Sequence, residues 1–274
     1  MKLHLFITCM VAAMLVACGA KTNTDGSEAV GQDSLQTDSV VAEQPKEELQ
    51  IETIVFKDSA KIAKEYTLYE VKLRIPAAGT VVGDSIRKYI CRLLNNGVTM
   101  DVRKAYGKAA KRYFAEQRKE VEDDEYAGEL TWGLETEVTI DTITPHYVSL
   151  CFTGYDYRGG AHGMPWSYGV TFAREDGHAL VWKDFFADKE KVRPFISKYL
   201  DPEILETVSE YCNLPEGSNP PASGADPWLH GDTVVINYGA YEIGPYVIGM
   251  PSANIPASKL SKLLKQRVQS LLED

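Results

Sequence analysis

The stretch WGLETEVTIDTITPHYVSLCFTGYDY, residues 132–157, decides the fold of this chain. From Trp132 to Thr142, apolar and β-branched residues alternate with mostly charged ones, and this period of two is typical of a half-buried β-strand. Thr144-Pro145 then makes a bend, and the run from Tyr147 to Tyr157 returns as the partner strand. The stretch therefore predicts a β-hairpin.

Further strands and helices are expected on both sides of the hairpin. Runs rich in β-branched and aromatic residues predict strands, and apolar residues spaced three and four apart predict helices. The expected strands cover residues 51–56, 69–75, 166–173, 178–182, 233–238 and 246–250. The expected helices cover residues 84–94, 101–121, 183–200, 202–211 and 260–271, and a long loop rich in Pro and Gly covers 213–231. Because no strict βαβ alternation appears, we expect an α+β fold, with a mainly antiparallel sheet and packed helices in two closely associated halves.

The first residues read as a secretory signal. Lys2 is followed by an apolar run from Leu3 to Ala17, which is too short to span a bilayer. The ending Leu15-Val16-Ala17-Cys18 resembles the bacterial lipobox, in which the cysteine is lipidated and becomes the first residue of the mature protein. The resemblance implies that residues 1–17 are removed and that acyl chains on Cys18, such as palmitate, attach the protein to a membrane. An ordinary signal cleaved nearby, with an incidental cysteine, is the alternative.

Residues 18–50 predict a flexible, acidic tether. They contain few large apolar side chains and many Ser, Thr, Gln, Asp and Glu residues, so they cannot bury enough surface to offset their ordering entropy. We therefore expect an extracytoplasmic protein that is lipid-anchored to the cell envelope. In a cell with two membranes we expect the outer one, because Gly19 lacks the acidic retention signal of lipoprotein sorting.

The body after the tether is a folded unit of mild charge. The formal net charge is −10, and about half of it lies in the tether. The body itself is therefore mildly acidic, which argues against nucleic acid as a partner, because nucleic-acid-binding domains are usually basic. Roughly 220 residues remain, enough to bury a sizeable core as one large domain or as two halves. We expect the halves at residues 51–163 and 164–274.

The expected helix over residues 101–121 is basic on its polar side. Such a helix can hold an acidic glycan or protein, or it can be an ordinary solvated helix face. The sequence leaves both interpretations open.

Three cysteines remain in the body, and their side chains are expected to be small apolar parts of the core. In an oxidising compartment they permit at most one internal disulfide, and their spacing matches neither a metal site nor a redox pair. They are Cys91, Cys151 and Cys212.

Two motifs are candidates for function: YDYRGGAHG at residues 155–163 and YEIGPYVIG at residues 241–249. Paired glycines let the backbone turn tightly and approach a ligand, and a histidine follows them on an expected loop. The candidate ligand-binding or structural residues are Tyr157, Gly159, Gly160, His162, Tyr241, Glu242 and Tyr246.

At these motifs the chain resembles a pair of extracytoplasmic domains of unknown function. The pair occurs in lysozyme-sensing anti-sigma factors of Gram-positive bacteria and in front of the catalytic domain of certain peptidoglycan deacetylases. A helix start, VWKDFF at residues 181–186, belongs to the same pattern. The likeness is clearest over residues 159–264 and weaker over 66–158, where Asp156 and Arg158 replace the usual Tyr and Thr. The resemblance implies a sensor-like ectodomain that binds a cell-wall glycan or a lysozyme-like secreted protein.

No residue pattern typical of an enzyme is found. The body lacks the His-x-x-x-His and Gly-x-Ser-x-Gly patterns, so we expect no catalytic residue, no metal and no cofactor. The alternative is a peptidoglycan or polysaccharide hydrolase or deacetylase, in which His162 and Glu242 form an acid/base pair or half of a metal site. A purely structural interpretation also stands: the glycines shape a turn, His162 donates to the backbone, and the second motif anchors the last hairpin.

Overall fold

A computed structural model describes residues 48–273 except 63, 96, 98 and 124–131. The signal peptide over residues 1–17, the lipidation site Cys18 and the tether as far as residue 47 lie outside the described residues, so these assignments stay predictions. Among the helices in the described part of the chain, none combines the length and the apolar character that crossing a membrane requires.

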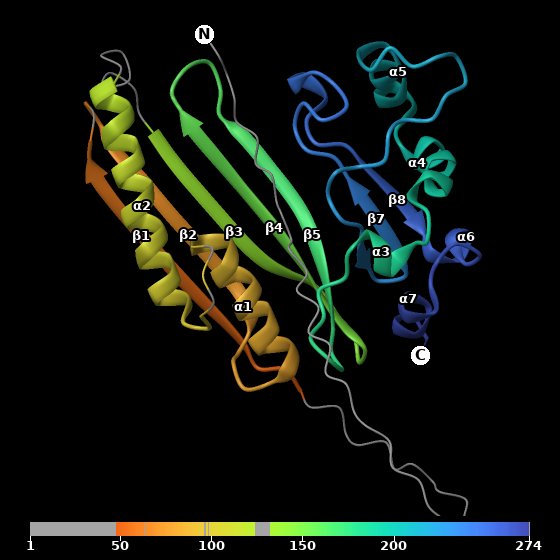
Figure 1. Ribbon diagram of the computed structural model, residues 1–274, viewed down its shortest axis with the longest axis horizontal. Helices are drawn as coiled ribbons and strands as arrows, with labels where there is room; N and C mark the ends of the chain where they lie inside the picture. Colours follow the sequence, from red (N-terminus) through yellow and green to blue (C-terminus); the bar gives the residue numbers. More distant parts are fainter. Residues whose placement is uncertain (1–47, 63, 96, 98, 124–131, 274) are drawn as a thin grey trace, which may run out of the picture. The chain divides into compact units, whose positions relative to one another are not determined.

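The first sheet has five strands in the order β1-β2-β3-β4-β5 (Figure 1). Its strands are β1 (Ile51–Lys61), β2 (Tyr66–Pro76), β3 (Trp132–Ile143), β4 (Tyr147–Arg158) and β5 (Met164–Ala173). The hairpin predicted from residues 132–157 is confirmed as β3 and β4. Neighbouring strands are antiparallel except β2 and β3, which are parallel. The sheet is therefore mainly antiparallel, and the predicted α+β class is confirmed.

Two helices, α1 (Val81–Asn95) and α2 (Val102–Asp123), connect β2 to β3 and cover one face of the sheet (Figure 1). A parallel pair of strands needs such a crossover, which explains the change of direction at this position. Alternate residues of β2, such as Val71 and Leu73, are buried against the helices. Helix α1 begins at Val81 rather than at the expected residue 84, because Thr80 Oγ1 caps its first turn by accepting from Gly83 N at 3.1 Å.

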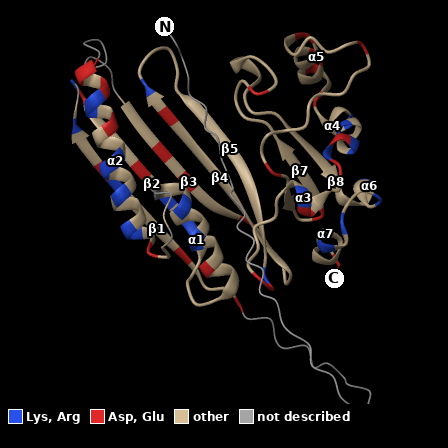
Figure 2. Cartoon of the chain, in the orientation of Figure 1, with Lys and Arg blue, Asp and Glu red and all other residues tan. Residues whose placement is uncertain are grey.

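Basic residues are spaced along α2 (Figure 2). Two of them have structural partners: Arg112 Nη2 donates to the carbonyl of Leu94 at 3.0 Å, and the guanidinium of Arg103 lies 5.4 Å from the ring centroid of Phe56. These contacts support the interpretation of α2 as an ordinary helix face whose long side chains cover neighbouring residues.

A second sheet follows along the chain and has its own core. Its strands β6 (Trp228–His230), β7 (Thr233–Asn237) and β8 (Ser252–Pro256) are antiparallel. Its helices are α3 (Trp182–Phe185), α4 (Arg193–Tyr199), α5 (Pro202–Tyr211), α6 (Ala257–Leu260) and α7 (Gln266–Leu271), and 3₁₀ turns lie at Lys189–Val192 and Tyr246–Ile248.

Several expectations for this second part were wrong. The strand expected at residues 246–250 is a 3₁₀ turn, and the helix expected at 183–200 is divided into α3, a 3₁₀ turn and α4. The helix expected at 260–271 is also interrupted, because Leu264 forms a β-bridge with Phe186 between α6 and α7. Strand β6 lies inside the expected loop at 213–231.

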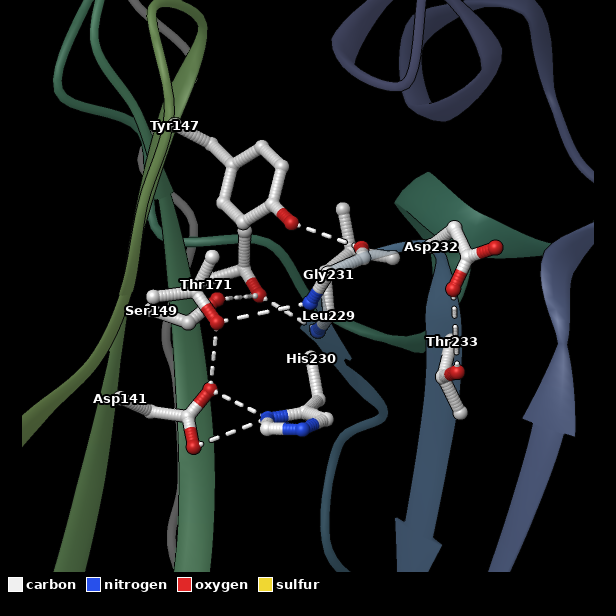
Figure 3. A network of polar contacts seen from close by, with 10 residues as sticks. Asp141, Tyr147, Ser149, Thr171, Leu229, His230, Gly231, Asp232 and Thr233 are labelled. Carbon is white, nitrogen blue, oxygen red and sulfur yellow. Dashed lines mark hydrogen bonds and ion pairs between the residues drawn. The ribbon is translucent and has the colours of Figure 1, made fainter.

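The two sheets are joined by polar contacts from β6 to the hairpin and β5 (Figure 3). Tyr147 donates its hydroxyl hydrogen to the carbonyl of Gly231 at 2.7 Å. Thr171 Oγ1 accepts from the backbone N–H of Leu229 at 2.8 Å. His230 Nδ1 lies 2.8 Å from a carboxylate oxygen of Asp141.

The boundary expected between the halves at residues 163 and 164 coincides with the start of β5. This strand pairs with β4 from Met164 to Ala173, so the first sheet takes its last strand from the expected C-terminal half. The extent of each half stays a prediction.

Candidate functional site

The two candidate motifs meet in the folded protein. Residues 159–163 connect β4 to β5, whereas residues 241–249 follow β7. The hydroxyl of Tyr246 donates to the carbonyl of Gly163 at 3.1 Å. The imidazole of His162 stacks on the ring of Tyr246 with centroids 3.9 Å apart and planes inclined by 17°. Segments far apart in the sequence therefore form one surface.

Two tyrosines of β4 hold the loop in place. Tyr155 and Tyr157 are two residues apart on one strand, so they share a face, and their rings are nearly parallel at 6.5 Å. The hydroxyl of Tyr155 accepts from the N–H of Gly163 at 2.8 Å, and the hydroxyl of Tyr157 donates to the carbonyl of Gly160 at 3.0 Å. Each hydroxyl is thus used within the protein.

The loop requires glycine at three positions. Gly159 and Gly160 have φ angles of 82° and 87°, which side chains disfavour. Gly163 lies so close to its neighbours that a Cβ there would meet the ring of Tyr155 and the carbonyl of Asp156.

Tyr241 is held in a strained conformation beside this loop. Its φ angle is 65°, an uncommon value for a bulky residue, and its side chain is exposed. Its ring centroid lies 5.6 Å from that of Tyr246. Strained residues of this kind cluster at functional sites, where the surrounding structure enforces them.

Glu242 stabilises the turn that presents Tyr241. Its Oε1 accepts from the N–H of Gly224 at 2.6 Å, and its Oε2 accepts from the N–H of Gly239 at 2.7 Å. Both carboxylate oxygens therefore bind backbone, which favours a structural role for this residue.

The acid/base pair considered from the sequence is not assembled. His162 contacts Tyr246 and approaches the carbonyl of Gly163 through Nδ1 at 3.1 Å, whereas Glu242 binds the two backbone N–H groups. Within the described residues, no hydrogen bond or ion pair joins His162 to Glu242. The described residues also contain no group of three His, Cys, Asp or Glu side chains suited to a metal ion.

We define the aromatic surface as Tyr155, Tyr157, His162, Tyr241 and Tyr246. Tyr155 is 40% exposed and Tyr241 is 42% exposed, and the neighbouring Val247 is 88% exposed. Because the hydroxyls of Tyr155, Tyr157 and Tyr246 bind the loop, this surface offers rings and aliphatic groups to a ligand. Tyr155 was not among the residues predicted from the sequence, although its spacing from Tyr157 was a signal for it.

The cysteines lie apart from this surface. Cys91 is buried as expected, whereas Cys151 and Cys212 are half-buried, and all three are free thiols. Burial raises the thiol pKa of Cys91 and of Cys151.

Comparisons with known proteins relate the chain to one family model and to solved structures of a domain family of unknown function. The family model described as Deacetylase PdaC matches residues 62–165. No curated protein matches the chain.

Two solved structures have a similar fold. A DUF3298 family member from Bacteroides fragilis is 17% identical, covers 82% of this chain and 97% of its own, and has a TM-score of 0.67. A DUF3298 family protein from Pseudomonas aeruginosa is 15% identical, covers 81% of this chain and 97% of its own, and has a TM-score of 0.59. At these identities the likeness is one of fold, and this chain is similar in fold to DUF3298 proteins.

Proposed function

We propose that this is a non-catalytic cell-envelope protein, anchored through lipidated Cys18, whose aromatic surface binds a cell-wall glycan. The observation that carries the proposal is the stack of His162 on Tyr246, which unites the two motifs beside the strained, exposed Tyr241. The predicted anchor and tether would hold this surface at the envelope.

The chemistry of the surface supports a glycan as ligand. One face of a sugar ring carries C–H groups, and such a face packs well on aromatic rings whose polar tips are already bonded. The described interactions leave the hydroxyl of Tyr241 without a partner, so it can hydrogen-bond to a bound sugar. The match to a family named for a deacetylase, together with the resemblance to domains that precede the catalytic domain of peptidoglycan deacetylases, also supports a glycan.

A secreted protein such as lysozyme is the second candidate ligand. The resemblance to lysozyme-sensing ectodomains favours it, and exposed aromatic and aliphatic side chains also suit a protein interface. A catalytic role is less well supported, because both oxygens of Glu242 bind backbone N–H groups.

Co-sedimentation with insoluble peptidoglycan tests the proposal. Full-length protein in detergent is expected to sediment with peptidoglycan, and Tyr241→Ala is expected to remain in solution. Tyr211→Ala is the matched control, since Tyr211 is a similarly exposed tyrosine at the end of α5. Wild-type protein that stays in solution, or equal losses in the two variants, would contradict glycan binding by this surface. Binding to lysozyme but not to peptidoglycan would identify a protein as the ligand.

The anchor has its own test. Cells fed labelled palmitate are expected to label the wild-type protein and not Cys18→Ser. An unlabelled wild-type protein would contradict the proposed anchoring.

A further inference from the structure

The two helices that cover the first sheet turn a basic face outward (Figure 2), and we propose that this face docks onto an anionic phospholipid membrane. We define the basic face as the exposed Lys and Arg residues of α1 and α2 that have no partner inside the protein. They are Lys88, Arg92, Lys104, Lys108, Lys111, Arg118 and Lys119. The inference goes beyond the proposed function, because it concerns another surface and another partner.

The basic residues form one stripe on each helix. In α2, Lys104, Lys108 and Lys111 are spaced four and three residues apart, so they share one side, and the buried residues of this helix lie on its other side. Lys88 and Arg92, four residues apart and both exposed, form the same kind of stripe on α1. Because α1 and α2 cover the same face of the sheet, the two stripes belong to one surface (Figure 1).

The fold itself does not use these charges. With the other described residues, the side chains of the basic face form no ion pair and no hydrogen bond. Arg103 and Arg112 of α2 differ from them, because they have the contacts with Phe56 and Leu94 described above. The basic face is therefore a solvated surface that is free to contact a partner.

The order of charges along α2 opposes the stability of the helix. The start of a helix is positive and its end negative, so acidic residues are favourable at the start and basic residues at the end. Beyond its cap at Asp101, α2 has no acidic residue in its first turn and no basic residue in its last turn, whereas Arg103 and Lys104 stand at its start. Like charges four residues apart, such as Lys104 and Lys108, add repulsion. An arrangement that costs stability and is not neutralised within the described residues indicates an anionic partner.

Two observations favour a membrane over a soluble acidic polymer. Leu93 in the last turn of α1 and Met100 before α2 are 51% and 47% exposed. Apolar side chains beside basic ones can enter the boundary between lipid head groups and acyl chains. The predicted tether would span roughly 30 Å as a flexible chain, so a body anchored through Cys18 can reach the membrane that holds its anchor.

Docking through the basic face would point the aromatic surface away from the membrane. Phe152 of β4 faces the helices, because its ring centroid lies 5.5 Å from that of Tyr89 in α1. Tyr155 and Tyr157 lie three and five residues further along the strand, so they belong to the opposite face of the sheet. A docked protein would therefore keep the aromatic surface open to a cell-wall glycan.

Acetylation of lysines in the full-length protein, incorporated into lipid vesicles, tests the inference. The vesicles contain phosphatidylcholine with or without phosphatidylglycerol, and brief labelling with a water-soluble reagent is measured by mass spectrometry. Lys104, Lys108 and Lys111 are expected to react severalfold more slowly in the anionic vesicles, because the membrane covers them. Lys189 and Lys191, exposed in the 3₁₀ turn before α4, are the internal control and are expected to react equally in both. Salt at about 1 M, where the Debye length falls to about 3 Å, is expected to remove the difference.

A charge reversal separates docking from stability. The double variant Lys104→Glu/Lys111→Glu is expected to abolish the protection of Lys108, because each Lys or Arg near an anionic surface strengthens binding roughly fivefold. The same variant is expected to raise the melting temperature, since it places a negative charge at the start of α2 and pairs both substituted positions with Lys108. Lys189→Glu/Lys191→Glu changes the net charge by the same amount and is the matched control, which is expected to keep the protection.

Equal reaction rates of Lys108 in the two kinds of vesicle, or equal loss of its protection in the two double variants, would overturn the inference. Protection by a soluble acidic polysaccharide in neutral vesicles, without protection by anionic lipid, would also overturn it and would identify a polymer as the partner. Incorporation into neutral vesicles tests the anchor separately. Protein that stays outside neutral vesicles but binds anionic ones at low salt would support docking by the basic face and contradict only the anchoring through Cys18.

Discussion

The imidazole of His162 lies on the phenol ring of Tyr246 with centroids 3.9 Å apart, and the hydroxyl of Tyr246 reaches the carbonyl of the next residue, Gly163. One tyrosine thus fixes both the histidine and the end of the loop that carries it. Because these contacts link two chain segments, the loop and the segment around Tyr246 should gain stability together.

Coupling between these two residues is the first prediction. His162→Ala and Tyr246→Ala are expected to lower the free energy of unfolding non-additively, with a coupling of about 0.5–1.5 kcal/mol for a stacked pair. Urea unfolding of the two single variants and the double variant measures it. Additivity within about 0.3 kcal/mol would contradict the stack.

Tyr241→Gly is expected to separate binding from stability. Glycine removes the backbone strain at a positive φ, worth about 1–2 kcal/mol, and this gain offsets the loss of packing on Tyr246. The free energy of unfolding is therefore expected to stay within about 1 kcal/mol of wild type, whereas sedimentation with peptidoglycan is lost. A large loss of stability would show that Tyr241 is a structural residue.

Substitutions of the loop glycines are expected to lower the stability of the protein for different reasons. Gly160→Val places a β-branched residue at a φ of 87° and is expected to cost at least about 2 kcal/mol. Gly163→Ala is expected to cost about as much through its clash with Tyr155, because overpacking typically costs 1–3 kcal/mol. Gly107→Ala in α2, where a Cβ meets no atom within 4 Å, is the control and is expected to stabilise by about 0.5–1 kcal/mol. Equal melting temperatures of all three variants would contradict the assigned loop geometry.

Local periodicity predicted the elements that are determined by contacts between residues close in the sequence. The hairpin of β3 and β4 follows from alternation and a proline bend, and α5 follows from its cap at Asp201, whose side chain accepts from the N–H of Glu203. The three-residue strand β6 is too short to show a period, so it could not be separated from a loop. The parallel pairing of β2 with β3 depends on how α1 and α2 pack, which no local pattern contains.

The residues of the site could be predicted from the sequence, but the surface that they form together could not. The glycines and His162 stand out as a motif, yet their contact with Tyr246 arises only when β7 and the following segment pack beside the loop. A cavity at Trp228 and Asn237 left no signal, because its lining comes from the four strands β5 to β8 and from Met250, and none of these residues forms a motif in the sequence.

Acid is expected to weaken the start of α3 through Asp184. Burial raises the pKa of this carboxyl, but the hydrogen bonds from His178 Nε2 at 2.8 Å and from the N–H of Val181 at 3.0 Å outweigh burial, so the pKa lies below its ordinary value. A carboxyl with a lowered folded-state pKa stabilises the protein above the unfolded pKa, near 3.9, and loses this contribution as the pH falls through the folded pKa.

Asp184→Asn is therefore expected to cost about 1.5–3 kcal/mol at pH 7, and this deficit should shrink below about pH 4. Asp226→Asn is the matched control, and its difference in stability from wild type is expected to change with pH in the opposite direction. Burial raises the pKa of Asp226, even though its carboxylate accepts from Trp182 N at 2.8 Å. As the pH falls through that raised pKa, wild type gains stability relative to Asp226→Asn, whose amide oxygen keeps the same hydrogen bond. Thermal unfolding of wild type and both variants from pH 3 to pH 7 measures the two trends. Parallel pH profiles for wild type and Asp184→Asn would show that the carboxylate at 184 does not hold His178 and Val181 in place.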